Sequence, residues 1–235
     1  MTDTTITQQL AAVFSHYRDL EAPLQQRLEG YAAASQKIFP AYGEAVDRLV
    51  ARLKDHDGGG LSPQIGDEMP DFLLPDDNGR LVSLLELIER RPTAVMFHRG
   101  HWCPYCRMNI GAVVRARHQI ASMGGQIVII MPENQQYARM FKLESGAPFP
   151  VLTDIDNSYA LSLGLAIWLG PELEKLLTEV GRVLPNYHGN DAWMLPIPAT
   201  FVVGQDQRIK ARFVDPDFRK RMDIDDLLAA FARTD

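Results

Sequence analysis

The chain has 235 residues, of which 46% are hydrophobic and 23% charged, and its formal net charge is −6. This length allows one sizeable core, or one domain with an appendage. The acidic balance argues against a general nucleic-acid binder, which usually presents a basic face. The first residues, MTDTTITQQLAAVF, lack a basic segment followed by an apolar run, and no apolar stretch approaches the ~18–20 residues that span a bilayer. We therefore expect a cytoplasmic protein, without a signal peptide, that binds neither nucleic acid nor membrane.

The first 57 residues have the apolar spacing of amphipathic helices. Apolar side chains recur at spacings of three and four in two runs: Leu20, Leu24, Leu28 and Tyr31, then Ala45, Leu49 and Leu53. Pro40 is expected to divide the region into two helices, because proline cannot continue one. We predict a helical extension over residues 1–57 that either covers a sheet face or forms a dimer contact, and we expect a homodimer.

Residues 58–70 form a predicted linker, and residues 71–235 the main domain. Three consecutive glycines and two prolines between Asp55 and Pro70 cannot continue a helix. Beyond a hairpin turn at 76–79, the predicted strands are 80–84, 93–99, 126–132 and 149–154, then a hairpin of 199–204 and 208–215. The predicted helices are 84–90, about 103–123, 134–146, 157–165, 171–181 and 224–234. This alternation indicates an α/β sheet covered on both faces, which the last hairpin makes mixed.

Both cysteines of the chain lie in the stretch AVMFHRGHWCPYCRMN, as Cys103 and Cys106. Such a pair is a redox pair, half of a metal site or a coincidence. Structural disulfides are rare in the cytosol, so a catalytic or metal-binding role is favoured. Cys103 falls where a helix should begin, and Pro104 suits the first helical position. The partial positive charge of a helix N-terminus stabilises a thiolate, and Cys106 lies one turn further along the same face.

The charge around the cysteines supports a reactive thiolate. Residues 90–132 contain six arginines and no aspartate or glutamate. Arg99 and Arg107 flank the cysteines, where they would stabilise a thiolate and attract an anionic or polar oxidant. We interpret Arg115 and Arg117 as residues of a solvated helix face.

His98 and His101 could complete a set of four metal ligands with the cysteines. A closed structural zinc site usually takes separated ligand pairs, and the sequence has no second pair, so we expect no metal and no cofactor. His101 either adjusts the pKa of the Cys103 thiol or is exposed to solvent. Trp102 is expected to pack beside Cys103 and limit its exposure.

The segments FHRGHWCPYC and IPATFVVGQDQRIKARFVDPDFRKR resemble the peroxiredoxin-like branch of the alkyl hydroperoxide reductase/thiol-specific antioxidant (AhpC/TSA) group, within the thioredoxin-fold superfamily. The resemblance extends over about residues 65–231. It implies a thioredoxin-like fold with an N-terminal β-hairpin. It also implies that Cys103 attacks the substrate, that Cys106 resolves it through a Cys103–Cys106 disulfide, and that Pro198 is a cis-proline beside the pair.

Two positions depart from the pattern of the family. Gly100 stands where peroxiredoxins carry Thr or Ser, and Pro198 stands where they place an Arg. Both missing groups orient peroxide and stabilise developing negative charge. Arg99, His98 or His101 are the candidates to replace them. With Trp102 and Thr200, the two histidines form the predicted substrate pocket.

The sequence leaves more than one function open. The first is a thiol peroxidase that reduces hydrogen peroxide or organic hydroperoxides and is itself reduced by thioredoxin or glutathione. The second is a thioredoxin-type oxidoreductase acting on a disulfide of a partner protein, which the CPYC motif and the two departures favour. The third is a non-enzymatic sensor, metal-binding or interaction module that uses the N-terminal helices.

Overall fold

The computed structural model describes residues 5–233 of the chain. Residues 1–4 of the predicted extension, and residues 234–235 at the end of the predicted domain and last helix, lie outside the described part. Its N-terminal region contains three helices: α1 (Ile6–Asp19), α2 (Leu24–Ile38) and α3 (Pro40–Asp55). The break at Pro40 is confirmed, but a second break at residues 20–23 was not predicted. There Leu20 ends α1 and Pro23 precedes α2, so the apolar run from Leu20 to Leu24 crosses two helices.

A mixed five-stranded sheet forms the centre of the molecule, as predicted. Its strands in spatial order are β5 (Val151–Thr153), β4 (Gln126–Met131), β3 (Thr93–Phe97), β8 (Ala199–Val203) and β9 (Ile209–Val214). β3, β4 and β5 are parallel, whereas β8 and β9 form the antiparallel hairpin. β3 is buried at every residue, which is expected of a central strand with both faces covered.

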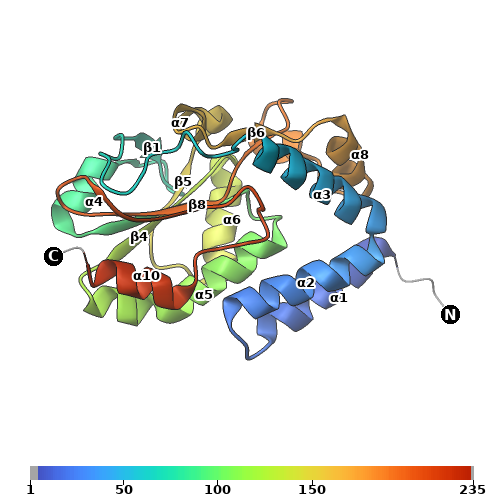
Figure 1. The fold of residues 1–235 in the computed structure, drawn as a ribbon, viewed down its shortest axis with the longest axis horizontal. Helices are drawn as coiled ribbons and strands as arrows, with labels where there is room; N and C mark the ends of the chain where they lie inside the picture. Colours follow the sequence, from blue (N-terminus) through green and yellow to red (C-terminus); the bar gives the residue numbers. More distant parts are fainter. Residues whose placement is uncertain (1–4, 234–235) are drawn as a thin grey trace.

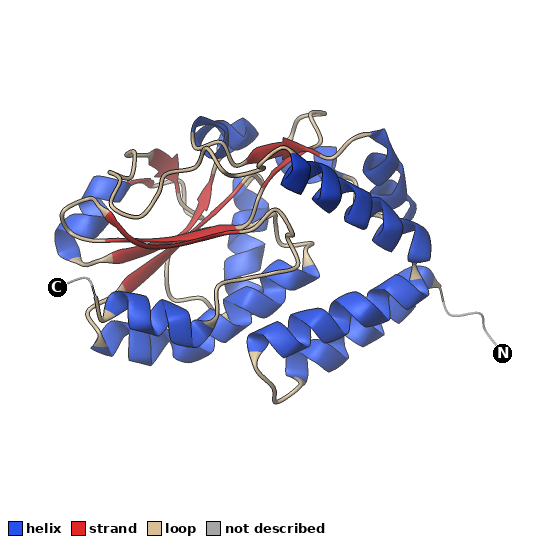
Figure 2. Ribbon diagram, viewed as in Figure 1, coloured by secondary structure: helices blue, strands red, loops and turns tan. Residues whose placement is uncertain are grey.

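Helices cover both faces of the sheet (Figure 2). On one side lie α5 (Pro104–Ser122), α6 (Gln135–Ser145) and α10 (Ile224–Phe231), and the other core includes residues of α4 (Leu84–Arg90) and α7 (Ser158–Ser162). Because strand side chains alternate, Ala94 and Met96 face the first core, and Val95 and Phe97 face the second. The thioredoxin-like arrangement therefore places α5, and the cysteines at its start, against the middle of the sheet.

Smaller elements complete the fold. The short strands β1 (Leu73–Pro75) and β2 (Leu81–Ser83) form the implied N-terminal β-hairpin. The other elements are η1 (Ile155–Asn157), β6 (Ala166–Trp168), α8 (Pro171–Glu179), α9 (Leu184–His188) and β7 (Met194–Pro196). β6, β7 and α9 were not predicted, because three to five residues are too few to show a period.

The N-terminal helices pack on the sheet domain of their own chain. α1 and α2 contact α5, and α3 contacts α8; Figure 1 shows them together at one end of the molecule. Leu28 is fully buried and Tyr31 is 3% exposed, both within the core that contains Cys103. The apolar faces on which the homodimer prediction depended are thus used within one chain, and the homodimer stays a prediction.

The predicted linker is held against the sheet. The Gly66 amide donates to the Ile209 carbonyl at 2.8 Å, and the Ile209 amide donates to the Asp67 carbonyl at 3.0 Å. These bonds fix residues 66–67 along the outer edge of β9. Across residues 5–233, we find no helix that is both long and apolar enough to cross a membrane.

Candidate active site

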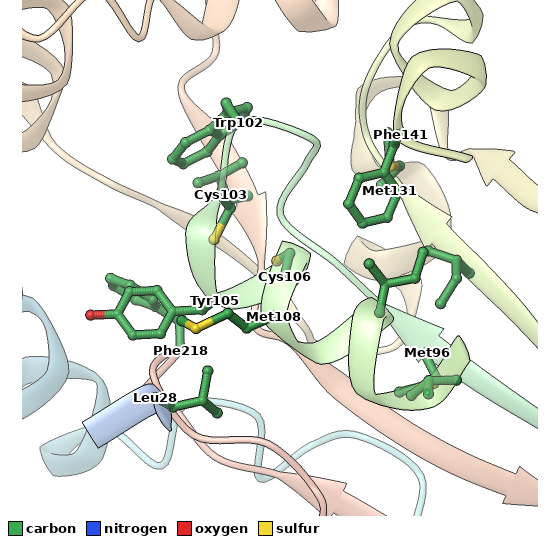
Figure 3. Packing of buried hydrophobic residues seen from close by; sticks show 14 of the residues in the cluster. Leu28, Met96, Trp102, Cys103, Tyr105, Cys106, Met108, Met131, Phe141 and Phe218 are labelled. Atoms are coloured by element: carbon green, nitrogen blue, oxygen red, sulfur yellow. The ribbon is translucent and has the colours of Figure 1, made fainter. Parts of the chain in front are cut away.

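The two cysteines lie at the start of α5, as the sequence predicts. Cys103 is the N-cap residue and Pro104 the first helical residue. Both cysteines are free thiols, and Cys103 is 1% and Cys106 0% exposed. Figure 3 shows the two sulfur atoms near each other, beside Trp102 and Tyr105. The positive end of the helix therefore meets Cys103 inside the protein, where water does not screen it.

Two N–H donors converge on the sulfur of Cys106. The Arg99 amide and the Arg221 Nη2 atom each donate to Cys106 Sγ at 3.3 Å. Burial raises the pKa of the Cys106 thiol, as does its hydrogen bond to Cys103, so Cys106 keeps its proton. Burial also acts to raise the pKa of Cys103, but the hydrogen bond from Cys106 and the charges of Arg99 and Arg221 outweigh it and lower the pKa to about 5. Cys103 is therefore the thiolate of the pair at neutral pH.

The two arginines are held in different ways. The Arg99 guanidinium carbon lies 3.6 Å from the centre of the Phe218 ring and 5.1 Å from that of Trp102. Arg221 donates from Nη1 to the carbonyls of Phe218 and Lys220. Aromatic faces and carbonyls hold a guanidinium without neutralising it. The positive charge is thus available to the sulfur atoms.

A small cavity of about 20 Å³ lies over Cys103. Its walls include Arg99 and Trp102, and they also include Tyr31, Phe39 and other residues of the N-terminal helices. A cavity of this volume has room for about one water-sized molecule. The extension therefore closes the site to large molecules.

The two histidines of the predicted pocket do not line this cavity. His98 is 1% exposed and bonds through Nε2 to Asn109 Oδ1 at 2.9 Å. Burial lowers its pKa to about 3, so the ring is neutral. His101 turns to Glu133, with its Nδ1 atom 2.7 Å from Oε1 and its amide 2.7 Å from Oε2. Of the three candidates to replace the missing peroxiredoxin groups, Arg99 lines the cavity, whereas His98 and His101 do not.

Glu133 explains why residue 100 is glycine. A Cβ atom on Gly100 would lie 2.6 Å from Glu133 Oε1 and 2.7 Å from Trp102 Nε1, and the φ angle of 141° disfavours any side chain. The Glu133 side chain is fully buried, and burial raises its pKa. The position of the family's Thr or Ser is therefore filled by a carboxylate and an indole from elsewhere.

The implied cis-proline is wrong. Residues 5–233 contain no cis peptide bond, and Pro198 is a buried trans residue that joins β7 to β8. Only Ile197 and Pro198 lie between the end of β7 and the start of β8. Thr200 is buried in β8 opposite Met96. The cavity over Cys103 is lined by neither Pro198 nor Thr200.

The structure separates the remaining predicted charges and metal ligands. Arg107 bonds to Glu144 at 3.0 Å, and its guanidinium lies over Phe14, away from the cysteines. Arg117 donates to the carbonyl of its own helix at Val114. In the described part of the chain, no three His, Cys, Asp or Glu residues gather closely enough to hold a metal ion.

Comparison with known proteins places this site in a family. Residues 65–212 match the AhpC/TSA family. The chain belongs to the AhpC/TSA family. Membership identifies a thiol-dependent redox protein, of the peroxidase or the thioredoxin type. A comparison with curated protein sequences finds no match.

Solved structures share the fold of this AhpC/TSA protein at low sequence identity. Peroxidoxin BcpB from Mycobacterium tuberculosis has a TM-score of 0.56 and 19% identity, over 72% of this chain and 96% of that one. A cysteine-to-serine mutant of peroxiredoxin 6 of Arenicola marina has a TM-score of 0.55 and 16% identity, over 72% of each chain. A thiol peroxidase from Chromobacterium violaceum has a TM-score of 0.51 and 16% identity, over 71% of this chain and 84% of that one. These similarities establish the thioredoxin-like fold.

Sequence reasoning missed two residues of the AhpC/TSA site. Arg221 belongs to the segment VDPDFRKR that carries part of the resemblance, yet nothing local links it to Cys106, which is 115 residues away. Glu133 follows directly on the stretch 90–132 that is free of acidic residues. Because β4 is parallel to β3, a residue just after β4 lies near the residues just after β3, and this neighbourhood could have predicted Glu133 as a site residue.

Proposed function

We propose that this protein is a thiol peroxidase in which Cys103 reduces hydrogen peroxide, whereas an organic hydroperoxide would need the N-terminal helices to move. The observation that carries the proposal is the cavity of about 20 Å³ over a buried Cys103 whose pKa is lowered to about 5. Such a site gives a small oxidant access to a thiolate and excludes a protein. Arg99, at the cavity wall, supplies the positive charge that the family's arginine would carry at the position of Pro198.

The first step consumes the hydroperoxide. The Cys103 thiolate attacks the terminal oxygen, the O–O bond breaks, and the leaving alkoxide or hydroxide takes up a proton to become an alcohol or water. Cys103 becomes a sulfenic acid, oxidised by two electrons. Arg99 faces the oxygen atoms as negative charge moves onto the leaving group.

The second step forms the predicted Cys103–Cys106 disulfide. The Cys106 sulfur attacks the Cys103 sulfur, and the hydroxyl group of the sulfenic acid leaves as water with the Cys106 proton. An external dithiol such as thioredoxin, or two molecules of glutathione, returns the disulfide to two thiols once the N-terminal helices move away from the cavity. A similar yeast mitochondrial peroxiredoxin, described as resolved by glutathione/thioredoxin systems, makes both reductants reasonable (TM-score 0.53, 12% identity, 71% of this chain and 73% of that one).

A thioredoxin-type oxidoreductase remains the second candidate, because both cysteines of the CPYC motif lie within reach of each other. A protein disulfide can reach Cys103 only if the N-terminal helices move away, since Tyr31 and Phe39 wall the cavity. The proposal therefore predicts a fast reaction with peroxide and a slow reaction with folded disulfide proteins.

The deciding experiment is rapid mixing of the reduced protein with hydrogen peroxide, with acid quenching and mass spectrometry of both cysteines. We expect a rate far above that of a free thiolate and an intramolecular disulfide as the product. Cys103→Ser should not react, and Cys106→Ser should stop at the sulfenic acid. A rate no higher than that of a free thiolate, with rapid exchange against a protein disulfide, would assign the second function instead.

A further inference from the structure

Arg221 is a buried cation without an acidic partner. It is 6% exposed, and no salt bridge joins it to a carboxylate among residues 5–233. Its neighbours in sequence differ, because Arg219 binds Asp217 and Asp47 at 2.7 Å and Lys220 binds Asp215 at 3.1 Å. Burying a guanidinium without a carboxylate partner costs stability, which is offset here by the backbone carbonyls and by the Cys103 thiolate.

The positive charge of Arg221 lies next to the sulfur of the second cysteine, Cys106. Arg221 Nη2 lies 3.3 Å from Cys106 Sγ, and Nη1 is fixed on the carbonyls of Phe218 and Lys220. The guanidinium is therefore held at the sulfur by bonds that do not depend on the redox state. Arg221 also lies beyond residues 65–212, the part that matches the family.

We propose that Arg221 is a catalytic residue of the second step, in which it stabilises the negative charge that develops on Cys106 as this sulfur attacks the oxidised Cys103. The inference rests on the proposed peroxidase cycle and names a residue that serves one step of it.

The charges around Cys106 explain why its activation waits for oxidation. In the reduced protein, the Cys106 thiol donates to the Cys103 thiolate, and that negative charge opposes a second one. Oxidation to the sulfenic acid makes Cys103 neutral, while the Arg99 amide and Arg221 still donate to Cys106. His98 is buried and neutral, and the charge of Arg221 helps to lower its pKa. Cys106 can then lose its proton to the departing hydroxyl group.

The experiment isolates the attack of Cys106 from the peroxide reaction. Methyl methanethiolsulfonate converts the Cys103 thiolate to a methyl disulfide and releases methanesulfinate. Cys106 then attacks the Cys103 sulfur, the S–S bond to the methylthio group breaks, and methanethiolate leaves. Quenched mass spectrometry follows the loss of the methylthio group over a range of pH. Parallel samples are oxidised with hydrogen peroxide.

The variants are Arg221→Met, Arg221→Lys and Lys220→Met, the last a control that removes the adjacent exposed cation. We expect Arg221→Met to slow disulfide closure at pH 7 by about tenfold and to move its pH profile about one unit upward, which corresponds to a shift of one pKa unit in Cys106. The closure rate of Arg221→Lys should lie between those of Arg221→Met and the wild type. The closure rate of Lys220→Met should equal that of the wild type. The first step should slow less than closure, because Arg99 still stabilises the Cys103 thiolate, and a Cys103 pKa that rises somewhat from about 5 still leaves this thiol mostly deprotonated at pH 7.

Two results would overturn the inference. One is an unchanged rate and pH profile of closure in Arg221→Met. The other is equal slowing of both steps without a shifted profile, with Arg221→Lys no better than Arg221→Met, which would assign Arg221 a structural role. Failure of the peroxidase proposal is recognised separately, because the peroxide samples then remain reduced while the methyl disulfide still reports on Arg221.

Discussion

Replacing Gly100 by serine, the residue type that peroxiredoxins carry at this position, should damage the protein. The new Cβ atom would lie 2.6 Å from Glu133 Oε1 and 2.7 Å from Trp102 Nε1, closer than real Cβ contacts. The φ angle of 141° adds backbone strain of about 1–3 kcal/mol. Moving the buried Glu133 carboxylate away from His101 weakens two charge-assisted hydrogen bonds, at about 1.5–3 kcal/mol in total. The free energy of unfolding should therefore fall by about 2.5–6 kcal/mol.

Urea unfolding of the wild type and Gly100→Ser, followed by circular dichroism, measures this loss. Gly146→Ser is the matched control, because Gly146 also has a positive φ, 65°, but no atom lies within 4 Å of its Cβ position. It should lose only about 1 kcal/mol, the cost of the backbone conformation. If Gly100→Ser lost no more than the control, or reacted faster with peroxide than the wild type, the explanation of Gly100 by Glu133 would be wrong.

Three further outcomes follow from the buried site. The ultraviolet absorbance of the thiolate should rise to half its maximum near pH 5, and Cys103→Ser should remove this step, because the pKa of Cys106 is raised. Tyr31→Ala should lower the free energy of unfolding by about 3–5 kcal/mol and raise the rate with cumene hydroperoxide relative to hydrogen peroxide, whereas Tyr31→Phe should change neither greatly. Because the pKa of His98 is about 3 when folded and about 6.5 when unfolded, the unfolded state binds the extra proton at pH 5. Through His98 alone, lowering the pH from 7 to 5 should therefore cost about 2 kcal/mol of stability, so urea unfolding of His98→Gln should show a loss about 2 kcal/mol smaller than that of the wild type.

The parts of the site that the sequence predicts lie close together in the chain. Cys103, Cys106, Arg99 and Trp102 fall within eight residues, and Pro104 marks the start of the helix that holds them. The order of the long elements was predictable for a similar reason, since an apolar strand or an amphipathic helix shows its period locally. Strands of three residues show none, which is why β6 and β7 were missed.

The remaining site residues come from distant segments. Arg221 precedes α10, and Glu133 follows β4, so only the folded chain brings them to α5. His101 was predicted to lie in the substrate pocket, where it would either adjust the pKa of the Cys103 thiol or be exposed to solvent, but its ring and amide bond to Glu133. A sequence pattern cannot choose between two such partners when one of them is 32 residues away.

The two departures from the family pattern have a common physical explanation. A thiolate attacking peroxide needs positive charge near both sulfur and oxygen, but that charge can come from any segment that reaches the site. Here the charge comes from Arg99, before α5, and from Arg221, near the C-terminus. At Gly100, atoms of Glu133 and Trp102 occupy the space that a side chain would need. The N-terminal helices, outside the family match, supply the wall that Tyr31 and Phe39 form over Cys103. Under the proposed peroxidase function, electrostatics and enclosure would therefore supply what the family's own residues supply at Gly100 and Pro198.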